Sequence, residues 1–434
     1  MNQERIEKLR KVLKASEAAA WEIIDTTETG WEFYLIGSQL DQHRVRDVNH
    51  IRLRVYTKGK EENTLGTAEG EVSPTADIAE MAGNVNALVE ASRYVVNPAW
   101  TLNQPVEQGL IPSTRPDIKK ISADFLQSLQ HLQQIETAYI NSSEIFVTNV
   151  TKRILNSEGL DVTDTYPSSM AEVIVNARDQ KHEIELYRMF QSGSCDTANF
   201  ESILLKTMKY GQDRLIAQET PAVGNIDLVL STDDAIEVYY WYIAHLNTSY
   251  KYRGYSDWSV GTAITSDTEG DAVTIKTRTT LPNSSRNCRF DDEGALTKDI
   301  TILKDNVPQS FFGPRQFSQY LDIKDSFNAR NFEVLGGSAD TALLLQGDYL
   351  EVVEFSSFQV DEVSGDIAGE IRLGYLHRGN QTMIVSGGSV SGNMSDMTGS
   401  IRFSKETAQY NNYLIPAVTR LTNISVAGAE RETH

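Results

Sequence analysis

The sequence predicts an α+β protein whose N-terminal half packs helices on mixed or antiparallel sheets and whose C-terminal half is a β-rich sandwich or barrel. Three observations lead to this prediction. Amphipathic helical segments flank runs of alternating apolar and polar residues up to about residue 220. This order of helix, strands and helix occurs twice. Beyond residue 220, short strand-like runs alternate with glycine turns.

The first unit covers about residues 1–110. Its first helix is predicted from apolar residues spaced as one buried stripe, which are Ile6, Leu9, Leu13, Ala20 and Ile24. Two segments, residues 31–37 and 50–57, alternate apolar and polar residues as half-exposed strands do, and residues 58–63 read as a hairpin tip. A second helix is expected to open at Ser73-Pro74-Thr75, because proline is favoured in a first turn.

The second unit, about residues 111–220, repeats this order. A proline-rich stretch, residues 96–117, reads as an ordered connector. A helix from Ile118 to Leu132 follows, then strands with a turn at 156–159, and a helix from about Asn199 to Gln218. We therefore expect an N-terminal domain, residues 1–220, of two similar units, and a C-terminal domain, residues 221–434.

The C-terminal domain opens with one short helix from Asp233 to Leu246. Closely spaced strands then dominate, and two glycine-containing segments, residues 363–366 and 378–381, are typical of hairpin tips. This pattern predicts the sandwich or barrel.

Composition limits the function. The chain has 434 residues with 60 acidic and 40 basic side chains, a formal charge of -20, which disfavours direct binding of nucleic acid or of an anionic membrane. A run of about 18 apolar residues is missing, and the N-terminus is a charged amphipathic helix rather than a signal peptide. Two cysteines form no disulfide framework. We expect a cytoplasmic protein.

The isolated motifs are weak. His182-Glu183 resembles the start of a zinc-protease motif, but it opens an alternating strand, so the two side chains point to opposite faces. Cys195 and Cys288 have no local signature of a nucleophile. The acidic turn Asp291-Asp292-Glu293-Gly294 could hold a metal, act as acid and base, or be a solvated corner, and its adjacent carboxylates favour the corner.

Several motifs in order resemble the TldD/PmbA family, whose name refers to modulation of DNA gyrase. The acidic turn with its following Thr297 and strand resembles a family turn of the form DDEG-x-x-T. The segment 252–256 before it, the hairpins at 364–366 and 387–393, and the closing strand at 421–428 fall in the family order. A glycine pattern at 66–70 extends the resemblance into the N-terminal half.

The resemblance implies one of two subunit types. TldD-like chains carry HExxxH on a helix and a later cysteine that bind a catalytic zinc, whereas TldE (PmbA)-like chains lack these residues and pair with TldD. Here the helix has Tyr240 and Trp241 at the first two motif positions and retains His245, and no cysteine follows Cys288. Zinc needs about three protein ligands and a positioned base to activate water. We therefore expect no catalytic or metal residues in this chain, and zinc only in a TldD-like partner.

The family motifs also name positions that are structural or line a peptide groove. We expect Gly294 to occupy a left-handed corner and the carboxylates to accept backbone N–H groups. The positions are Arg253, Gly254, Ser256, Asp291, Asp292, Glu293 and Gly294.

Three functions stay open from the sequence. The first is a noncatalytic subunit of a heterodimer with a TldD-like protease that hydrolyses peptides or unfolded segments. The second is a peptidase with a displaced site that uses His245, His182 or Cys288. The third is a homodimeric peptide-binding protein, because an insertion-like stretch at Gln39–Asn49 and an aromatic helix at Tyr239–Tyr242 depart from the family, and aromatic surfaces favour interfaces.

Overall fold

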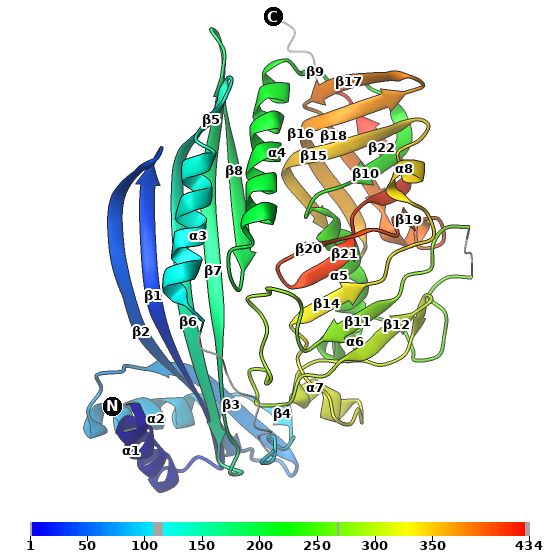
Figure 1. Ribbon diagram of the computed structural model, residues 1–434. Coiled ribbons are helices and arrows are strands. Elements are labelled where there is room, and N and C mark those ends of the chain that lie inside the picture. Colours follow the sequence, from blue (N-terminus) through cyan, green and yellow to red (C-terminus); the bar gives the residue numbers. More distant parts are fainter. Residues whose placement is uncertain (1, 107–115, 267–268, 430–434) are drawn as a thin grey trace, which may run out of the picture.

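Three sheets organise the chain in a computed structural model that describes residues 2–106, 116–266 and 269–429 (Figure 1). One long sheet with four helices forms the N-terminal half, and two sheets with shorter helices form the C-terminal half. The α+β prediction is thus confirmed, including a barrel in the C-terminal half.

The N-terminal sheet runs in the order β4-β3-β2-β1-β6-β7-β8, with β5 paired to β6. The chain visits helix, three strands and helix twice, and the two sets meet where β1 pairs antiparallel with β6. A common origin of the two sets stays a prediction. The elements are α1 (Asn2–Ala15), β1 (Ala20–Ile36), β2 (Gln39–Lys58), β3 (Thr64–Val72), α2 (Ile78–Ser92), β4 (Asn97–Pro98), α3 (Ile118–His131), β5 (Gln134–Ile135), β6 (Ala138–Asn156), β7 (Asp161–Arg178), β8 (Glu183–Ser192) and α4 (Thr197–Leu215).

Two cores hold these helices to the sheet. The first joins the apolar stripes of α1 and α2 to strands β1 and β2, where Ile23, Leu53 and Val55 are fully buried. The second joins α3 and α4 to β6 and β7 around Phe125 and Phe200, whose ring centroids lie 5.1 Å apart. Alternate strand residues face the helices, as a period of two requires.

Three details of the N-terminal half differ from the prediction. The first helix ends at Ala15, and Ala20 and Ile24 belong to β1, where pairing with β2 overrides the helical spacing. The second helix begins at Ile78 because Asp77 caps it, with its side chain accepting from the Glu80 N–H at 2.9 Å. The insertion-like stretch, residues 39–49, forms the first half of β2 and pairs with β1, where no strand was expected.

The C-terminal half contains a closed barrel. Strand β15 pairs with both β10 and β16, so β15-β10-β22-β18-β16 form a ring, to which β17, β9 and β19 are added. A second sheet runs β13-β12-β11-β14-β21-β20. The strands are β9 (Gln218–Glu219), β10 (Gly224–Leu230), β11 (Ile275–Arg278), β12 (Ile300–Lys304), β13 (Val307–Pro308), β14 (Asn331–Val334), β15 (Tyr349–Val360), β16 (Asp366–Arg378), β17 (Gln381–Ser386), β18 (Ser389–Asn393), β19 (Arg402–Phe403), β20 (Thr407–Tyr410), β21 (Tyr413–Pro416) and β22 (Thr419–Ala427).

Helix α5 (Ala235–His245) packs into one core with the barrel and the second sheet. Tyr239 and Tyr242 are fully buried there, so the expectation that this aromatic helix offers an exposed interface is wrong. Eight of the eleven residues of α5 are buried, which matches a helix enclosed on most sides. The other C-terminal helices are α6 (Thr248–Arg253), α7 (Arg315–Tyr320), α8 (Thr341–Leu344) and the short η1 (Met394–Asp396).

Helix α4 joins the two halves, since it lies between the long sheet and the barrel (Figure 1). Asp213 of α4 accepts a hydrogen bond from the Tyr375 hydroxyl of β16 at 2.8 Å, and Arg188 of β8 forms an ion pair with Glu354 of β15. The predicted connector, residues 96–117, docks on α7 through Thr101 and Gln319, while its residues 107–115 lie outside the described part.

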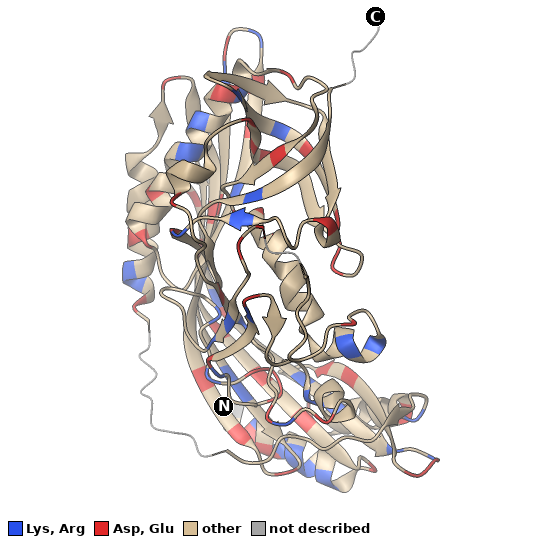
Figure 2. Cartoon of the chain, turned by 90° about the vertical axis from the view of Figure 1, so that its right-hand side faces the viewer, with Lys and Arg blue, Asp and Glu red and all other residues tan. Residues whose placement is uncertain are grey.

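Acidic and basic positions occur on the same helices and strands in Figure 2, in both halves of the chain. Among the helices that the structure describes, none is long and apolar enough to cross a membrane.

Candidate functional site

The motif positions on α5 lie in an aromatic cluster. Trp241 and His245 are only 5% and 6% exposed. The His245 ring lies 4.8 Å from the ring centroid of Trp241 and 4.8 Å from that of Trp258. Burial lowers the pKa of His245, with only Asp257 acting in the opposite direction. The imidazole is therefore neutral at neutral pH and is enclosed by rings rather than by ligands.

Four buried polar atoms of this cluster have no hydrogen-bond partner among the described residues: Trp241 Nε1, the Tyr242 hydroxyl oxygen and both ring nitrogens of His245. Within the same described ranges, no three His, Cys, Asp or Glu side chains come together so as to hold a metal ion. The degenerate motif is thus filled by aromatic side chains. Tyr240 differs from its neighbours because it faces a cavity, described below.

The structure keeps His182, His245 and Cys288 in separate environments. His182 is exposed before β8, where its Nδ1 lies 3.7 Å from Asp179 Oδ1. Cys288 is buried, and burial raises the pKa of its thiol to about 11, which leaves it protonated at neutral pH. Burial likewise raises the pKa of Cys195 to about 12. Neither thiol has the lowered pKa of a nucleophile.

The segment 253–256 forms the end of α6. Gly254 caps the helix in the left-handed region, with φ +76. The Arg253 guanidinium lies over the Phe317 ring of α7, 5.3 Å from its centroid, and Ser256 is buried. Arg253 thus contacts α7, and Arg253, Gly254 and Ser256 line neither of the two cavities described below.

The acidic turn lies at the junction of the two halves with Asp291 and Gly294 buried, which corrects the solvated corner that its chemistry alone favoured. Asp291 is fully buried and accepts three backbone N–H bonds, from Glu293 and Ala295 at 2.9 Å and from Asn328 at 2.7 Å. Gly294 occupies the expected left-handed corner, with φ +76. Phe290 packs beneath the turn with Ile24 and Leu160 of the N-terminal half.

Asp292 binds two cations, one from each half of the chain. Its Oδ1 lies 2.6 Å from Lys152 Nζ of β6 and 2.5 Å from Arg330 Nη2. Burial acts to raise the pKa of Asp292, but Arg330 and Lys152 outweigh it and hold the pKa at about 2. The carboxylate is therefore ionised at every physiological pH.

A cavity of about 550 Å³ surrounds this group; we call it the α5 cavity. Its walls come from the long sheet, from α5 and α6, and from loops of the C-terminal half. Five charged residues and four tyrosines are among its lining residues. They include Glu28, Lys152, Asp292, Arg286, Arg330 and Tyr240.

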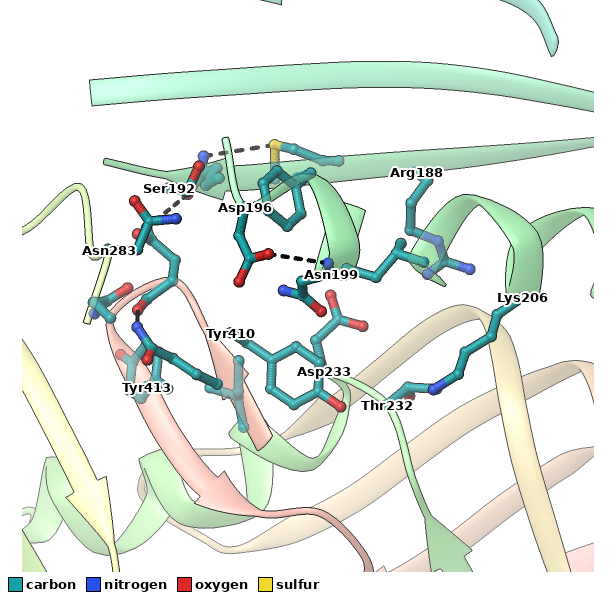
Figure 3. A pocket seen from close by; sticks show the side chains of 18 of the residues that line it. Arg188, Ser192, Asp196, Asn199, Lys206, Thr232, Asp233, Asn283, Tyr410 and Tyr413 are labelled. Atoms are coloured by element: carbon teal, nitrogen blue, oxygen red, sulfur yellow. Dashed lines mark hydrogen bonds between the residues drawn. The ribbon is translucent and has the colours of Figure 1, made fainter. Parts of the chain in front are cut away.

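A second cavity of about 380 Å³, the α4 cavity, opens beside it (Figure 3). Five consecutive residues of β8, from Arg188 to Ser192, line it on one side, and β8 is the last strand of the long sheet. The opposite wall is the tip of the β20–β21 hairpin. Figure 3 shows Tyr410 and Asp233 across from Arg188, with Asp196 accepting from the N–H of Asn199 at the start of α4.

The sequence analysis did not identify the charged residues that line the α5 cavity. Lys152, Arg286 and Arg330 have no motif around them, and Lys152 and Asp292 are 140 positions apart. The alternation of side chains along a strand could have assigned Lys152 to one face of the strand, but it could not have placed Lys152 beside Asp292.

Comparison with known protein families finds a match in the C-terminal half of the chain. Residues 224–428 match the model of the PmbA/TldA metallopeptidase C-terminal domain. No curated protein sequence matches the chain.

Solved structures share the fold over nearly the whole length. A proposed modulator of a DNA gyrase from Thermotoga maritima has a TM-score of 0.77 at 15% identity and covers 98% of this chain and 100% of its own. TldE from Thermococcus kodakarensis has a TM-score of 0.76 at 14% identity, with 98% and 100% covered. A proposed modulator of DNA gyrase from Bacteroides thetaiotaomicron has a TM-score of 0.78 at 14% identity, with 98% and 99% covered. Residues 224–428 therefore form a C-terminal domain of the PmbA/TldD family, and the chain as a whole has the fold of these three solved structures.

Proposed function

We propose that this chain is a TldE/PmbA-like subunit without a zinc site of its own, which acts with a TldD-like zinc metalloprotease in the hydrolysis of peptides or unfolded segments. The observation that carries the proposal is the aromatic filling of α5. Trp241 stands where a catalytic glutamate is expected, and it contacts the one retained motif histidine, His245.

The chemistry of these side chains supports a noncatalytic role. An indole cannot act as a general base for water, and an imidazole enclosed by Trp241 and Trp258 has no room to share a metal with other ligands. The two thiols of the chain are protonated at neutral pH, which disfavours the peptidase with a displaced site.

A reconstitution experiment tests the proposal. The purified chain alone is expected to carry substoichiometric zinc and to leave an unfolded peptide intact. Co-expression with an HExxxH-bearing TldD-like chain is expected to give a stable complex that cleaves the peptide. The matched control is the same complex with glutamine in place of the partner's motif glutamate, which should assemble but not cleave.

Stoichiometric zinc that survives dialysis of the lone chain, or cleavage by it that a chelator stops, would overturn the assignment. We also propose that the chain resides in the cytoplasm. Fractionation of native cells tests this location.

A second candidate is a homodimeric peptide-binding protein without catalysis. It is favoured by the two adjacent cavities of this chain, whose linings share Asn412 and Tyr413. Purification from native cells distinguishes the two candidates: a TldD-like chain either accompanies the protein or a dimer of identical chains is recovered without it.

A further inference from the structure

The α4 cavity and the α5 cavity are two parts of one cleft. Asn412 and Tyr413, at the tip of the β20–β21 hairpin, line both. The loop that contains Asn283 and Arg286 also reaches both cavities, since Asn283 lines the α4 cavity and Arg286 lines the α5 cavity. The tip and the loop are tied together by Asn411, whose Oδ1 accepts from the Ser285 N–H at 2.9 Å. A ligand longer than one residue can therefore reach from one cavity into the other.

The charges of the α5 cavity leave one cation available. Lys152 and Arg330 are both bound to Asp292. Glu28, the other acidic residue of the lining, is bound 2.8 Å from Arg46. Arg286 is exposed, and its guanidinium has no ion pair or side-chain hydrogen bond with any residue that the structure describes. In a chain of net charge -20, an unpaired guanidinium in a cavity is a site for an anion.

The α4 cavity has a different chemistry. Much of its wall is apolar or aromatic, from β8, α4, α5 and the hairpin: Met189, Phe190, Ile203, Tyr210, Ile236 and Tyr410. Its charged residues offset one another, because Lys206 and Asp233 line the same space. It therefore suits an apolar side chain rather than a charged group.

We propose that the cleft binds the C-terminal end of a peptide: Arg286 binds the α-carboxylate in the α5 cavity, and the α4 cavity receives an apolar side chain close to that end. The inference rests on the proposed function only in taking the ligand to be a peptide. It adds that this subunit itself recognises the end of the chain, and it identifies Arg286 as the residue that determines this specificity.

The physical basis is the match between guanidinium and carboxylate. Arginine presents parallel N–H donors that a carboxylate accepts in pairs, and such charge-assisted bonds are stronger than neutral ones. An extended peptide advances about 3.3 Å per residue and alternates its side chains, so a residue next to the bound carboxylate can direct its side chain into the neighbouring cavity.

Binding to the full-length chain in the absence of a partner tests the inference. The probes are a fluorescent pentapeptide with leucine at its last two positions and a free C-terminus, the same peptide as C-terminal amide, the same peptide with glycine for leucine, and acetyl-leucine as an unlabelled competitor. Fluorescence polarisation gives each Kd. We expect the amide to bind about tenfold or more weakly than the acid. The glycine peptide should also bind more weakly.

Arg286→Gln should remove the preference for the acid and leave the affinity for the amide nearly unchanged, whereas Arg286→Lys should keep part of the preference. Arg402→Gln is the matched control, because Arg402 is an exposed arginine of β19 that lines neither cavity. Circular dichroism before and after the substitutions checks that each variant is folded.

Three results would overturn the inference: equal Kd values for acid and amide, an unchanged preference in Arg286→Gln, or competition by acetyl-leucine as strong as that of the peptide, which would indicate a site for small carboxylates. Each leaves the proposed function standing if the reconstituted complex cleaves its substrate. If the complex does not cleave the peptide but the chain still prefers the peptide acid, the proposed subunit role is wrong and the C-terminal binding site stands.

Discussion

Gly294 and Gly254 share one backbone conformation in very different surroundings. Both have φ +76, a value that L side chains rarely adopt. A Cβ on Gly254 would meet nothing within 4 Å, whereas a Cβ on Gly294 would lie 2.2 Å from Leu160 Cδ2. Leu160 is 1% exposed, so its side chain has no free space into which to move. A substitution at Gly254 therefore tests the cost of backbone strain alone, whereas one at Gly294 tests strain together with crowding against Leu160.

We expect Gly254→Ala to lower the free energy of unfolding by about 1 kcal/mol, the cost of the left-handed backbone alone. Gly294→Ala should lower it by about 2 to 4 kcal/mol, because overpacking against Leu160 is added to the strain. Urea unfolding of both variants at pH 7 measures the difference. If the two variants lose the same stability, the contact with Leu160 does not constrain the turn.

Single residues of the site differ in how far the sequence could specify them. The left-handed corner at Gly294 follows from a glycine after three polar residues, because only glycine adopts that conformation at low cost. The burial of Asp291 does not follow, since three backbone N–H groups from two segments solvate it in place of water. Arg286 and Lys152 were missed for the same reason: their importance arises from segments that meet only in the folded chain.

Helix α5 carries two buried tyrosines, of which one has a hydrogen-bond partner for its hydroxyl and the other has none among the described residues. The Tyr239 hydroxyl lies 2.8 Å from Thr419 Oγ1 of β22, while the Tyr242 hydroxyl has no partner among the described residues. Both side chains are fully buried. A satisfied buried hydroxyl stabilises modestly, and an unsatisfied one carries its desolvation cost.

Replacing each tyrosine by phenylalanine should therefore change stability in opposite directions. Tyr239→Phe is expected to lower the free energy of unfolding by about 1 kcal/mol, because it leaves Thr419 without its partner. Tyr242→Phe should leave it unchanged or raise it by up to about 1 kcal/mol. The two variants serve as controls for one another in thermal unfolding. A loss in Tyr242→Phe as large as that in Tyr239→Phe would contradict the prediction.

The elements themselves were predictable where local pattern and tertiary packing agree. Helices α3, α4 and α5 have strong apolar stripes and begin within two residues of the expected positions. The first helix was extended wrongly to Ile24, because the strand that follows it happens to continue the helical spacing of apolar residues. The closure of the barrel depends on β15 pairing with two distant strands, which periodicity within one strand cannot reveal.

Three carboxylates, two buried and one half-buried, lie close together where the two halves of the molecule meet. Glu22 of β1 comes from the N-terminal half and accepts a hydrogen bond from the Tyr56 hydroxyl at 2.5 Å. Asp291 and Glu293 come from the acidic turn. Burial raises the pKa of all three, and repulsion adds to it: from Asp291 at Glu22 and Glu293, and from Asp292 at Asp291. Asp291 accepts three N–H bonds and Glu293 only one, from Arg315, so we expect Glu293 to retain the proton.

This arrangement makes the joining of the halves sensitive to pH. A carboxyl whose pKa is higher in the folded state binds more protons folded than unfolded, so the free energy of unfolding decreases as pH rises from its ordinary value of 4.5 toward the folded value. Stability from the proton on Glu293 is therefore present in full at pH 4 and is lost progressively into the alkaline range. Ionised, Glu293 would be repelled by Asp291 and Glu22, against the attraction of Arg54.

Glu293→Gln should remove this loss, because the amide keeps an acceptor for the Arg315 N–H and cannot ionise. We expect the variant to be close to the wild type at pH 5 and more stable by about 1 kcal/mol or more at pH 9, measured by urea unfolding across that range. Glu185→Gln, on the exposed face of β8, removes the same charge outside the junction and should follow the wild-type profile. Parallel profiles for Glu293→Gln and the wild type would mean that Glu293 is already ionised when the halves are joined, and the proton would then have to reside on Asp291 or Glu22.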